Sequence, residues 1–266
     1  MHNLLIHLPA NKRLIWYLAA EEFYAKNIHL LNHTFTKGTQ NSSNNVKTIE
    51  GIFFTWIVSP TVIFGRHQVM ENEVNTPFCQ ANNIAMYRRK TGGGCVYADE
   101  GNLMISYISP SSHSEQVFQN YLDRMSDCLR GMGYDAVKST HNDIMVGEHK
   151  VSGNACFALP YATIVHGTLL YDVDFDTLQH AITPSQEKLA KHGVESVRQR
   201  VINLKDAQII LEEKGYKVSK FQGIEAFAEQ IKEYWCEASY IPTENDLLAI
   251  DTIEQEYLNP DFIHSR

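Results

Sequence analysis

The sequence predicts an α+β fold in which a mostly antiparallel sheet is flanked by helices. Between residues 143 and 173, three apolar runs are separated by Gly147-Glu148 and Pro160-Tyr161, which is the pattern of an antiparallel meander. Strands do not alternate with helices here, so a doubly wound parallel sheet is disfavoured. Further short runs rich in aromatic or β-branched residues also predict strands, at residues 53–58, 62–64 and 103–108.

Two helices are predicted from apolar residues that recur at helical spacing. The first covers residues 11–26, with Asn11 as its predicted cap. Its apolar face consists of Leu14, Tyr17, Leu18 and Ala25. The second covers residues 114–131, with Ser114 as the predicted cap and Gly131 as the predicted stop. We expect both helices to pack against the sheet.

The remaining segments divide into a polar loop and a helical C-terminal part. Residues 33–51 are too poor in apolar side chains to offset their ordering entropy by burial, and a mobile surface loop is predicted there. Residues from about 205 to 266 are predicted to be helical, and Thr243 with Asp246 resembles a capping box. Because no internal repeat or linker is found, residues 1–266 are interpreted as one domain.

Composition excludes several classes of protein. A formal charge of -8 over 266 residues argues against a nucleic-acid binder, which would present a basic face. The five cysteines are far apart and lack a C-x-x-C arrangement, so neither a disulfide framework nor a zinc site is predicted. No apolar stretch approaches membrane-spanning length, and the N-terminus lacks the features of a secretory signal. The sequence therefore predicts a cytoplasmic globular protein with no membrane partner.

The most informative stretch is Arg88-Arg89-Lys90-Thr91-Gly92-Gly93-Gly94-Cys95-Val96-Tyr97. Glycines let backbone N–H groups converge on phosphate or carboxylate oxygens, and the preceding cations add positive charge. The spacing is neither that of a Walker loop nor that of a dinucleotide-binding fingerprint. Taken alone, a triple glycine is more often a turn than a ligand site. The stretch is therefore a candidate anion-binding loop.

Two other stretches carry candidate functional residues. His149-Lys150-Val151-Ser152-Gly153-Asn154-Ala155 places Lys150 beside a predicted hairpin turn, where a lysine is usually a solvated surface charge. His166-Gly167-Thr168-Leu169-Leu170 places a histidine in a predicted strand, where it is more often a hydrogen-bonded core residue than a catalyst. Glycine in mid-strand is less common and indicates that a ligand or another backbone segment approaches closely.

These stretches and several others resemble the lipoate-protein ligase A family, both in residues and in order. In chain order the matching stretches are Val62 to Gln68, Arg88 to Val96, Asp99 to Leu103, Asn142 to Ile144, Lys150 to Ala155, His166 to Leu170 and Ser196 to Leu204. This ordered set is far more specific than any single motif. The resemblance runs from about the first helix to near the end of the chain.

The resemblance implies a fold shared with biotin ligases and class II aminoacyl-tRNA synthetases, and a reaction in two steps. Lipoate, or octanoate, and MgATP would give an acyl-adenylate and pyrophosphate. A lysine of a lipoyl domain, in the E2 subunits of 2-oxoacid dehydrogenase complexes or in the glycine cleavage H protein, would then accept the acyl group. ATP and Mg²⁺ would be substrates, and no tightly bound cofactor is expected.

The resemblance also assigns roles to residues. Lys150 would be the catalytic cation and would contact both the phosphate and the lipoyl carbonyl. The nucleotide would be bound by Lys150, Arg89, Gly94, Cys95, Val96, Tyr97 and Asp143, with Asp143 a candidate for holding Mg²⁺. The lipoyl group would be bound by Lys150, Gly65, Arg66, Gly92, Gly93, His166 and Gly167.

Two departures from the family pattern leave alternatives open. Ala98 replaces the histidine that often precedes Asp99, and Glu256-Tyr257-Leu258 resembles only the entrance of the C-terminal accessory domain that full-size bacterial ligases carry. That domain is interpreted as absent here. It would be supplied as a separate subunit, or the chain would only transfer lipoate from preformed lipoyl-AMP.

Two further alternatives concern the chemistry. A transferase of the same fold that acts through a cysteine thioester would need a reactive thiol. One class of these transferases carries its cysteine just before the Asn-Asp-Ile stretch, where this chain has His141, but Cys95 and Cys156 lie in nearby stretches. The other alternative is a non-catalytic lipoate-binding subunit.

Overall fold

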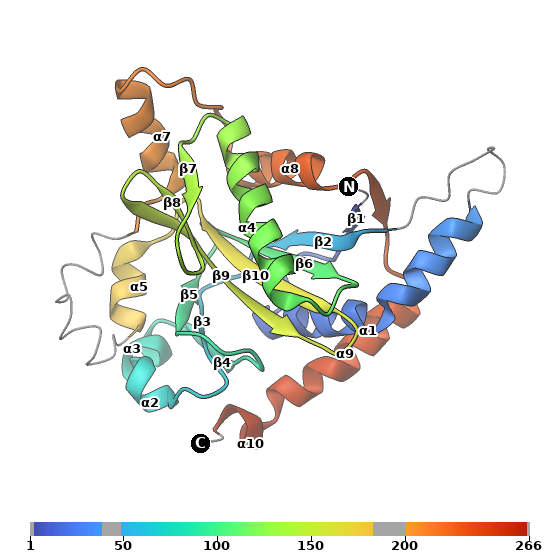
Figure 1. Ribbon diagram of the computed structural model, residues 1–266. Coiled ribbons are helices and arrows are strands. Elements are labelled where there is room, and N and C mark those ends of the chain that lie inside the picture. The colour runs from blue at the N-terminus through green and yellow to red at the C-terminus, as the bar shows by residue number, and fades with distance from the viewer. Residues whose placement is uncertain (1–2, 39–48, 183–200, 265–266) are drawn as a thin grey trace.

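The computed structural model describes residues 3–38, 49–182 and 201–264 (Figure 1). The main sheet is built from β1 (Asn3–Ile6), β2 (Gly51–Trp56), β6 (Asn102–Ser109), β7 (Ala136–Lys138), β8 (Asp143–Val146), β9 (His149–Ala158), β10 (Thr163–Leu170) and β11 (Ala238–Tyr240). A smaller sheet contains β3 (Thr61–Phe64), β4 (Ala85–Arg88) and β5 (Val96–Ala98). The helices are α1 (Leu14–Gly38), α2 (Met70–Glu73), α3 (Thr76–Ala81), α4 (Ser114–Gly131), α5 (Phe175–Ala181), α7 (Leu204–Glu213), α8 (Ile224–Trp235), α9 (Glu244–Leu258) and α10 (Pro260–Ile263).

The main sheet has the order β11-β1-β2-β6-β10-β9-β8-β7. β1 pairs in parallel with β2 and β11, and every other neighbouring pair in this sheet is antiparallel. The small sheet has the order β4-β3-β5, with β3 parallel to β4 and antiparallel to β5. The predicted α+β fold with a mostly antiparallel sheet is confirmed, as is the antiparallel meander, which consists of β8, β9 and β10.

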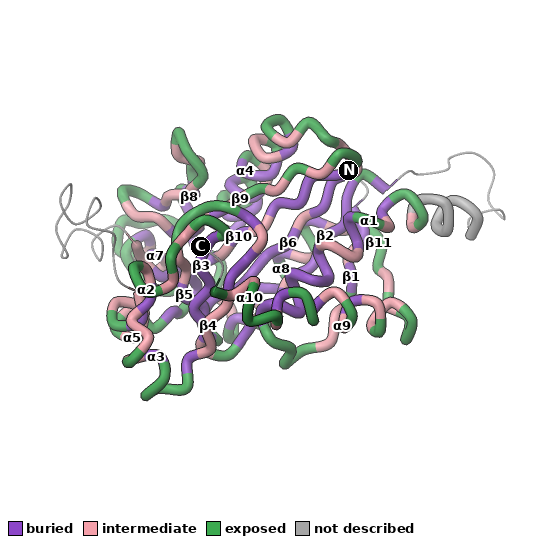
Figure 2. Tube along the Cα trace, turned by 90° about the horizontal axis from the view of Figure 1, so that it is seen from below, coloured by how far each residue is buried: buried purple, intermediate pink, exposed green. Residues whose placement is uncertain are grey.

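Helices cover both faces of the main sheet. Successive side chains of a strand point to opposite faces, and the central strands have apolar side chains on each face. In β2, Phe53 packs with α4 and α8 on one face, whereas Ile52 and Phe54 pack with α1 and α9 on the other. In β10, Val165 faces α4 and Ile164 faces α1 by the same alternation. Figure 2 shows the central strands buried between the two helical layers. The face toward α1 and α9 is the one that carries the candidate site.

The first helix differs from its prediction at both ends. α1 begins at Leu14, so Asn11 does not directly precede the helix. Its φ of 61° is left-handed, whereas a cap residue usually has an extended backbone, so Asn11 is not the cap. α1 continues to Gly38, so the first part of the predicted polar loop is helical instead. Residues 39–48 of that predicted loop lie outside the described residues, and Ile49, the first residue described after them, is buried.

The second helix has the predicted bounds but different ends. Ser114 is its first residue, and the flanking residue is His113, which makes no side-chain cap. Gly131 is the last helical residue, but the left-handed turn that ends the helix occurs at Gly133, whose φ is 97°. There the Gly133 N–H donates to the Arg130 carbonyl, and the next N–H donates to the Leu129 carbonyl, as in a Schellman motif.

The C-terminal part is not wholly helical. β11 lies between α8 and α9 and extends the sheet by pairing with β1, and neither strand was predicted. The predicted capping box of Thr243 and Asp246 is confirmed at the start of α9. The two strands predicted around Ser59-Pro60 also exist, but β2 and β3 belong to different sheets. Among the described residues, no helix is long and apolar enough to cross a membrane.

Candidate active site

The glycine-rich loop connects β4 to β5 and passes over the end of β3. β4 and β5 lie on either side of β3, so the connection between them must cross the point where β3 ends at Phe64. There the Arg66 N–H donates to the Thr91 carbonyl at 2.9 Å. The loop lies so close to Gly65 that a Cβ at Gly65 would be 2.3 Å from the Gly93 oxygen. Gly65 is therefore a glycine because the loop packs on it.

Arg89 holds the loop from the inside. Its Nε and Nη2 donate to the Gly92 carbonyl at 3.1 and 2.8 Å, and Nη2 also donates to the Gly94 carbonyl at 2.7 Å. Nη1 donates to the Ile63 carbonyl at 3.2 Å. Only 5% of Arg89 is exposed, and this burial lowers its pKa to about 10, so it stays charged near neutral pH. A buried guanidinium with this set of acceptors fixes the path of the loop.

The carbonyls that face Arg89 determine where the loop N–H groups point. In a trans peptide the C=O and the following N–H point in opposite directions, and the described chain has no cis peptide. With the Gly92 and Gly94 carbonyls turned toward Arg89, the N–H groups of Gly93 and Cys95 point away from it. The three glycines are exposed. The loop thus presents outward-facing donors, as an anion-binding loop requires.

Arg88 links the site to the end of the chain. Its Nη1 donates to the carbonyls of Arg66 at 2.8 Å and Gln68 at 2.7 Å, and its Nε donates to the carbonyl of Ile263 in α10 at 3.0 Å. The guanidinium also lies 4.8 Å from the centre of the Phe64 ring. Sequence reasoning treated Arg88 as a source of charge and of hydrogen-bond donors for an anion. In the fold it is buried, and its hydrogen bonds connect the segment after β3 to α10.

Lys90 is held by carboxylates from α1 and α9. Its Nζ lies 2.9 Å from Glu22 in α1, 2.7 Å from Glu256 in α9 and 4.5 Å from the centre of the Tyr257 ring. The hydrogen bond from Lys90 lowers the pKa of Glu256, and burial raises the pKa of Tyr257, whose hydroxyl donates to Glu22. The cations of the Arg-Arg-Lys motif are thus engaged by protein acceptors.

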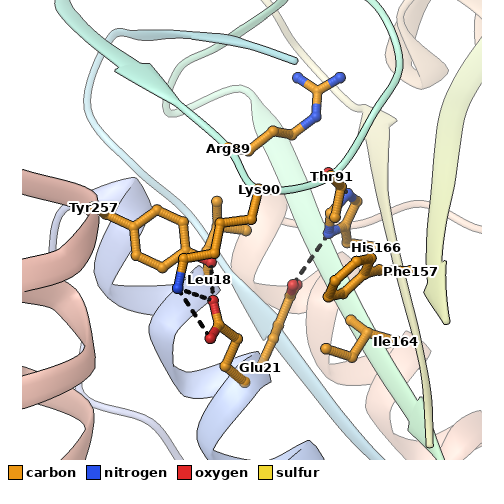
Figure 3. Close-up of a pocket in the computed structure, with 10 residues that line it drawn as sticks. Leu18, Glu21, Arg89, Lys90, Thr91, Phe157, Ile164, His166 and Tyr257 are labelled. Atoms are coloured by element: carbon orange, nitrogen blue, oxygen red, sulfur yellow. Dashed lines mark hydrogen bonds and ion pairs between the residues drawn. The ribbon is translucent and has the colours of Figure 1, made fainter. Parts of the chain in front are cut away.

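A small cavity lies beneath the loop (Figure 3). Its lining combines apolar residues from α1 and the main sheet with polar residues of α1, the main sheet, the loop and α9: Leu18, Phe157, Ile164, Glu21, Glu22, Arg89, Lys90, Thr91, His166 and Tyr257. Its volume is about 10 Å³, which is room for about one water molecule. An acyl group could occupy it only after side chains move. Phe157 and Lys90 are two long, half-buried side chains in its wall.

Lys150 lies on the same face of the sheet, farther along β9. Its Nζ forms an ion pair with Asp143 at 2.7 Å across the β8–β9 hairpin. The side chain lies over Gly153, where a Cβ would be 2.9 Å from Nζ. Gly153 is two residues before Ala155, the cross-strand partner of His166, which is about 7 Å along a strand. Lys150 and the cavity therefore share one surface.

Sequence comparison identifies the family. Residues 31–222 match the model of the lipoyl protein ligase A/B catalytic domain. The chain belongs to this family. It is 36% identical to lipoate–protein ligase 1 of Staphylococcus aureus over 61% of this chain and 50% of that protein. It is 35% identical to lipoate-protein ligase LplJ of Bacillus subtilis over 57% of this chain and 46% of that protein. The chain thus spans about half the length of these relatives.

Solved structures described as lipoate protein ligases have the same fold. A bi-partite lipoate protein ligase from Thermoplasma acidophilum superposes with a TM-score of 0.74 at 24% identity, covering 99% of this chain and 96% of that one. A lipoate-protein ligase A bound with ATP superposes with a TM-score of 0.69 at 23% identity, covering 99% of each chain. At these identities the likeness shows the architecture, and it confirms the fold expected from the resemblance.

The family residues predicted for the site fall into distinct places. Gly92 to Cys95 belong to the glycine-rich loop, Val96 begins β5, Gly65 and Arg66 lie against the loop, and His166 lies in the cavity wall. Gly167 faces the opposite side of the sheet, where a Cβ would be 2.0 Å from the Asn154 Oδ1 and 3.0 Å from the Tyr121 hydroxyl. Those side chains, on the side of α4, account for the mid-strand glycine. The assignment of each residue to lipoate or nucleotide stays a prediction.

Sequence reasoning missed Glu21, Glu22, Phe157 and Tyr257 in the cavity wall. For Glu21 the sequence held a signal. It lies three residues after Leu18 and four after Tyr17, so it occupies the apolar face of the first helix. A carboxylate on a stripe of core residues must find partners inside the protein, because burying it alone costs several kcal/mol or more. Tyr257 gave no such signal, because its contacts depend on the packing of α9.

Proposed function

We propose that this chain is the catalytic unit of a lipoate–protein ligase, which activates lipoate with MgATP and transfers the lipoyl group to a lysine of a lipoyl domain. The observation that carries the proposal is the placement, on one face of the sheet, of Lys150 and of the partly apolar cavity beneath an outward-facing N–H loop. The names of the Staphylococcus and Bacillus relatives, and the ATP-bound structure of similar fold, support it.

The distance along the sheet fits a medium-chain acyl group. From Gly153, beneath the Lys150 amine, to Phe157, in the cavity wall, β9 advances four residues, or about 13 Å. This is the reach of an extended lipoyl or octanoyl chain. The carboxylate would lie beside Lys150, and the tail would enter between Leu18, Ile164 and Phe157. Apolar walls with a cation at one end favour an amphipathic acid of this length.

In the first step, a lipoate carboxylate oxygen attacks the α-phosphorus of ATP and pyrophosphate leaves. Two anions must approach, so the site has to supply positive charge and hydrogen-bond donors where charge accumulates. Lys150 would contact the phosphate and the lipoyl carbonyl, and the N–H groups of Gly93 and Cys95 would face phosphate oxygens. Mg²⁺ would enter with ATP as substrate, with Asp143, the ion-pair partner of Lys150, as a candidate contact.

In the second step, the ε-amine of an acceptor lysine attacks the lipoyl carbonyl carbon, and AMP leaves as the amine loses a proton. The acceptor would be a lipoyl domain of an E2 subunit or of H protein. The Thermoplasma structure described as a bi-partite ligase with its E2 lipoyl domain supports both a lipoyl-domain acceptor and a separate accessory subunit. We also propose that the reaction takes place in the cytoplasm.

The test is to incubate the purified protein with lipoate and MgATP and to detect lipoyl-AMP and pyrophosphate by mass spectrometry. Formation of both supports the ligase. Transfer from supplied lipoyl-AMP to an apo lipoyl domain, without adenylate formation, would restrict the function to transfer and would indicate a missing accessory subunit. Binding of lipoate with neither reaction would contradict catalysis and would favour a binding subunit.

We expect no acyl-enzyme intermediate during turnover. A thioester mechanism needs an accessible thiolate, but burial raises the pKa of Cys95 to about 12. Cys156 is exposed, and partial burial of its thiol raises its pKa as well, which disfavours the thiolate. Protein quenched in acid during the reaction should therefore have its unmodified intact mass, while the acceptor domain gains a lipoyl group. An acyl adduct that maps to the peptide containing Cys95 or Cys156 would overturn the adenylate mechanism in favour of a thioester.

A further inference from the structure

A buried hydrogen-bonded chain runs from the centre of the main sheet to the cavity. The Trp56 Nε1 donates to the Ser106 Oγ at 2.9 Å, and the Ser106 hydroxyl donates to the Glu21 Oε1 at 2.6 Å. The Glu21 Oε2 lies 3.1 Å from the His166 Nδ1, and the His166 Nε2 lies 3.2 Å from the Thr91 Oγ1. Figure 3 shows the Glu21 and His166 pair at the floor of the cavity.

The carboxylate at the centre of this chain determines which nitrogen of His166 carries a proton. Only 3% of Glu21 is exposed, and an ionised carboxylate accepts hydrogen bonds but donates none. The His166 Nδ1 must therefore be the donor to Glu21. In the neutral ring the Nε2 then has a free lone pair, so the Thr91 hydroxyl must donate to it.

Thr91 passes this constraint to the glycine-rich loop. It is buried, its carbonyl accepts the Arg66 N–H, and the next carbonyl along the chain, that of Gly92, accepts from Arg89. The start of the loop is thus fixed by its side chain through His166 and by its backbone through Arg66. Loss of the first attachment would leave the loop backbone free to shift relative to the floor of the cavity.

We propose that Glu21 is a positioning residue: it fixes His166 as the Nδ1–H tautomer and thereby holds Thr91 and the start of the glycine-rich loop over the cavity. This arrangement parallels carboxylates that orient a functional histidine elsewhere. The tautomer is a property of the folded chain alone. The effect on catalysis rests on the proposed ligase function.

The first test reads the tautomer directly. The ¹⁵N shifts of the histidine rings, assigned by comparison with His166→Gln, should show His166 protonated at Nδ1 and unprotonated at Nε2 in the neutral form. In Glu21→Gln, whose amide can donate toward Nδ1, the population of the Nε2–H tautomer should rise. The matched control is Glu254→Gln, which neutralises another buried carboxylate, one paired with Arg13, and should leave the His166 signals unchanged.

A wild-type His166 found as the Nε2–H tautomer would overturn the proposal, whatever the variants do.

The second test is kinetic. Glu21→Gln should lower kcat for lipoyl-AMP formation about tenfold and change the KM for lipoate less than about threefold, because a misplaced loop affects the transition state most. Glu254→Gln should retain kcat within about twofold. Equal losses of kcat in both variants would show a structural role only.

The tautomer of His166 and the rate of lipoyl-AMP formation can be measured independently. If the wild-type protein forms no lipoyl-AMP but shows the Nδ1–H tautomer that responds to Glu21→Gln, the ligase proposal fails and the positioning of His166 stands. If the protein is an active ligase and Glu21→Gln matches the wild type in both kcat and tautomer, the ligase stands and the positioning role is wrong.

Discussion

Replacing Lys150 with alanine should reduce lipoyl-AMP formation about a thousandfold or more while the protein stays folded. A cation about 4 Å from a phosphate oxygen contributes roughly 4 kcal/mol at an effective dielectric near 20, and each 1.4 kcal/mol is about tenfold in rate. The side chain is 34% exposed, so its removal leaves no core cavity. Pyrophosphate release and adenylate yield measure the rate, and thermal unfolding checks the fold.

The chain offers a closely matched control in Lys138. Its Nζ lies 2.7 Å from Asp123, and its side chain is 34% exposed, the same values as for Lys150 and Asp143. Lys138 is in β7, at the edge of the sheet and away from the cavity lining. Lys138→Ala should therefore keep its activity within about twofold, since exposed ion pairs contribute little. Equal activity of the two variants would remove Lys150 from the mechanism.

The features predicted from sequence are those encoded by short stretches. The triple glycine, the Lys150 hairpin and the capping box of α9 each depend on residues within about ten positions of one another, so local chemistry was enough. The predicted caps of α1 and α4 were wrong. Asn and Ser are preferred as cap residues, but a helix does not have to begin at one. Strands such as β1 and β11 are too short to give a periodic signal.

The remaining part of the site depends on contacts that are distant in the chain. Glu21 meets Ser106 and His166, which follow it by 85 and 145 positions. Arg88 meets Ile263, which is 175 positions away. A local sequence pattern cannot predict which strand will lie beneath α1, or that α9 and α10 will lie near β4. The sequence shows that Glu21 is on a buried face, but only the fold identifies its partner.

The roles of Arg88, Arg89 and Lys90 could not be predicted from sequence either, because they too depend on distant contacts. Their residue types indicated an anion site, and the loop that they precede does present outward N–H groups. The guanidiniums themselves donate to backbone carbonyls, and Lys90 pairs with carboxylates. The sequence shows that cationic side chains are present, but it does not show which acceptors they will bind. In this chain the arginines shape the loop, and we expect Lys150, in the strand next to that of His166, to be the cation that contacts substrate.

Gly65→Ala should lower adenylate formation about a hundredfold, the second largest effect we expect. A Cβ at Gly65 would lie 2.3 Å from the Gly93 oxygen and 3.3 Å from its carbonyl carbon. Both are backbone atoms, so the loop must move by about 1 Å, and a misplacement of that size costs about 10²-fold in rate. The φ of Gly65 is not left-handed, so the backbone conformation itself accepts alanine. Steady-state rates at varied ATP measure the effect.

The control for this substitution is Gly131→Ala at the end of α4, where a Cβ would meet no atom within 4 Å. It should leave activity unchanged and raise stability slightly, because alanine is favoured over glycine in a helix by up to about 1 kcal/mol. A loss of kcat with a melting temperature near that of the wild type places the glycine-rich loop at the reacting phosphate. Retention of full activity would mean that the loop can shift by about 1 Å without disturbing the reaction, and the anion would then have to be bound elsewhere.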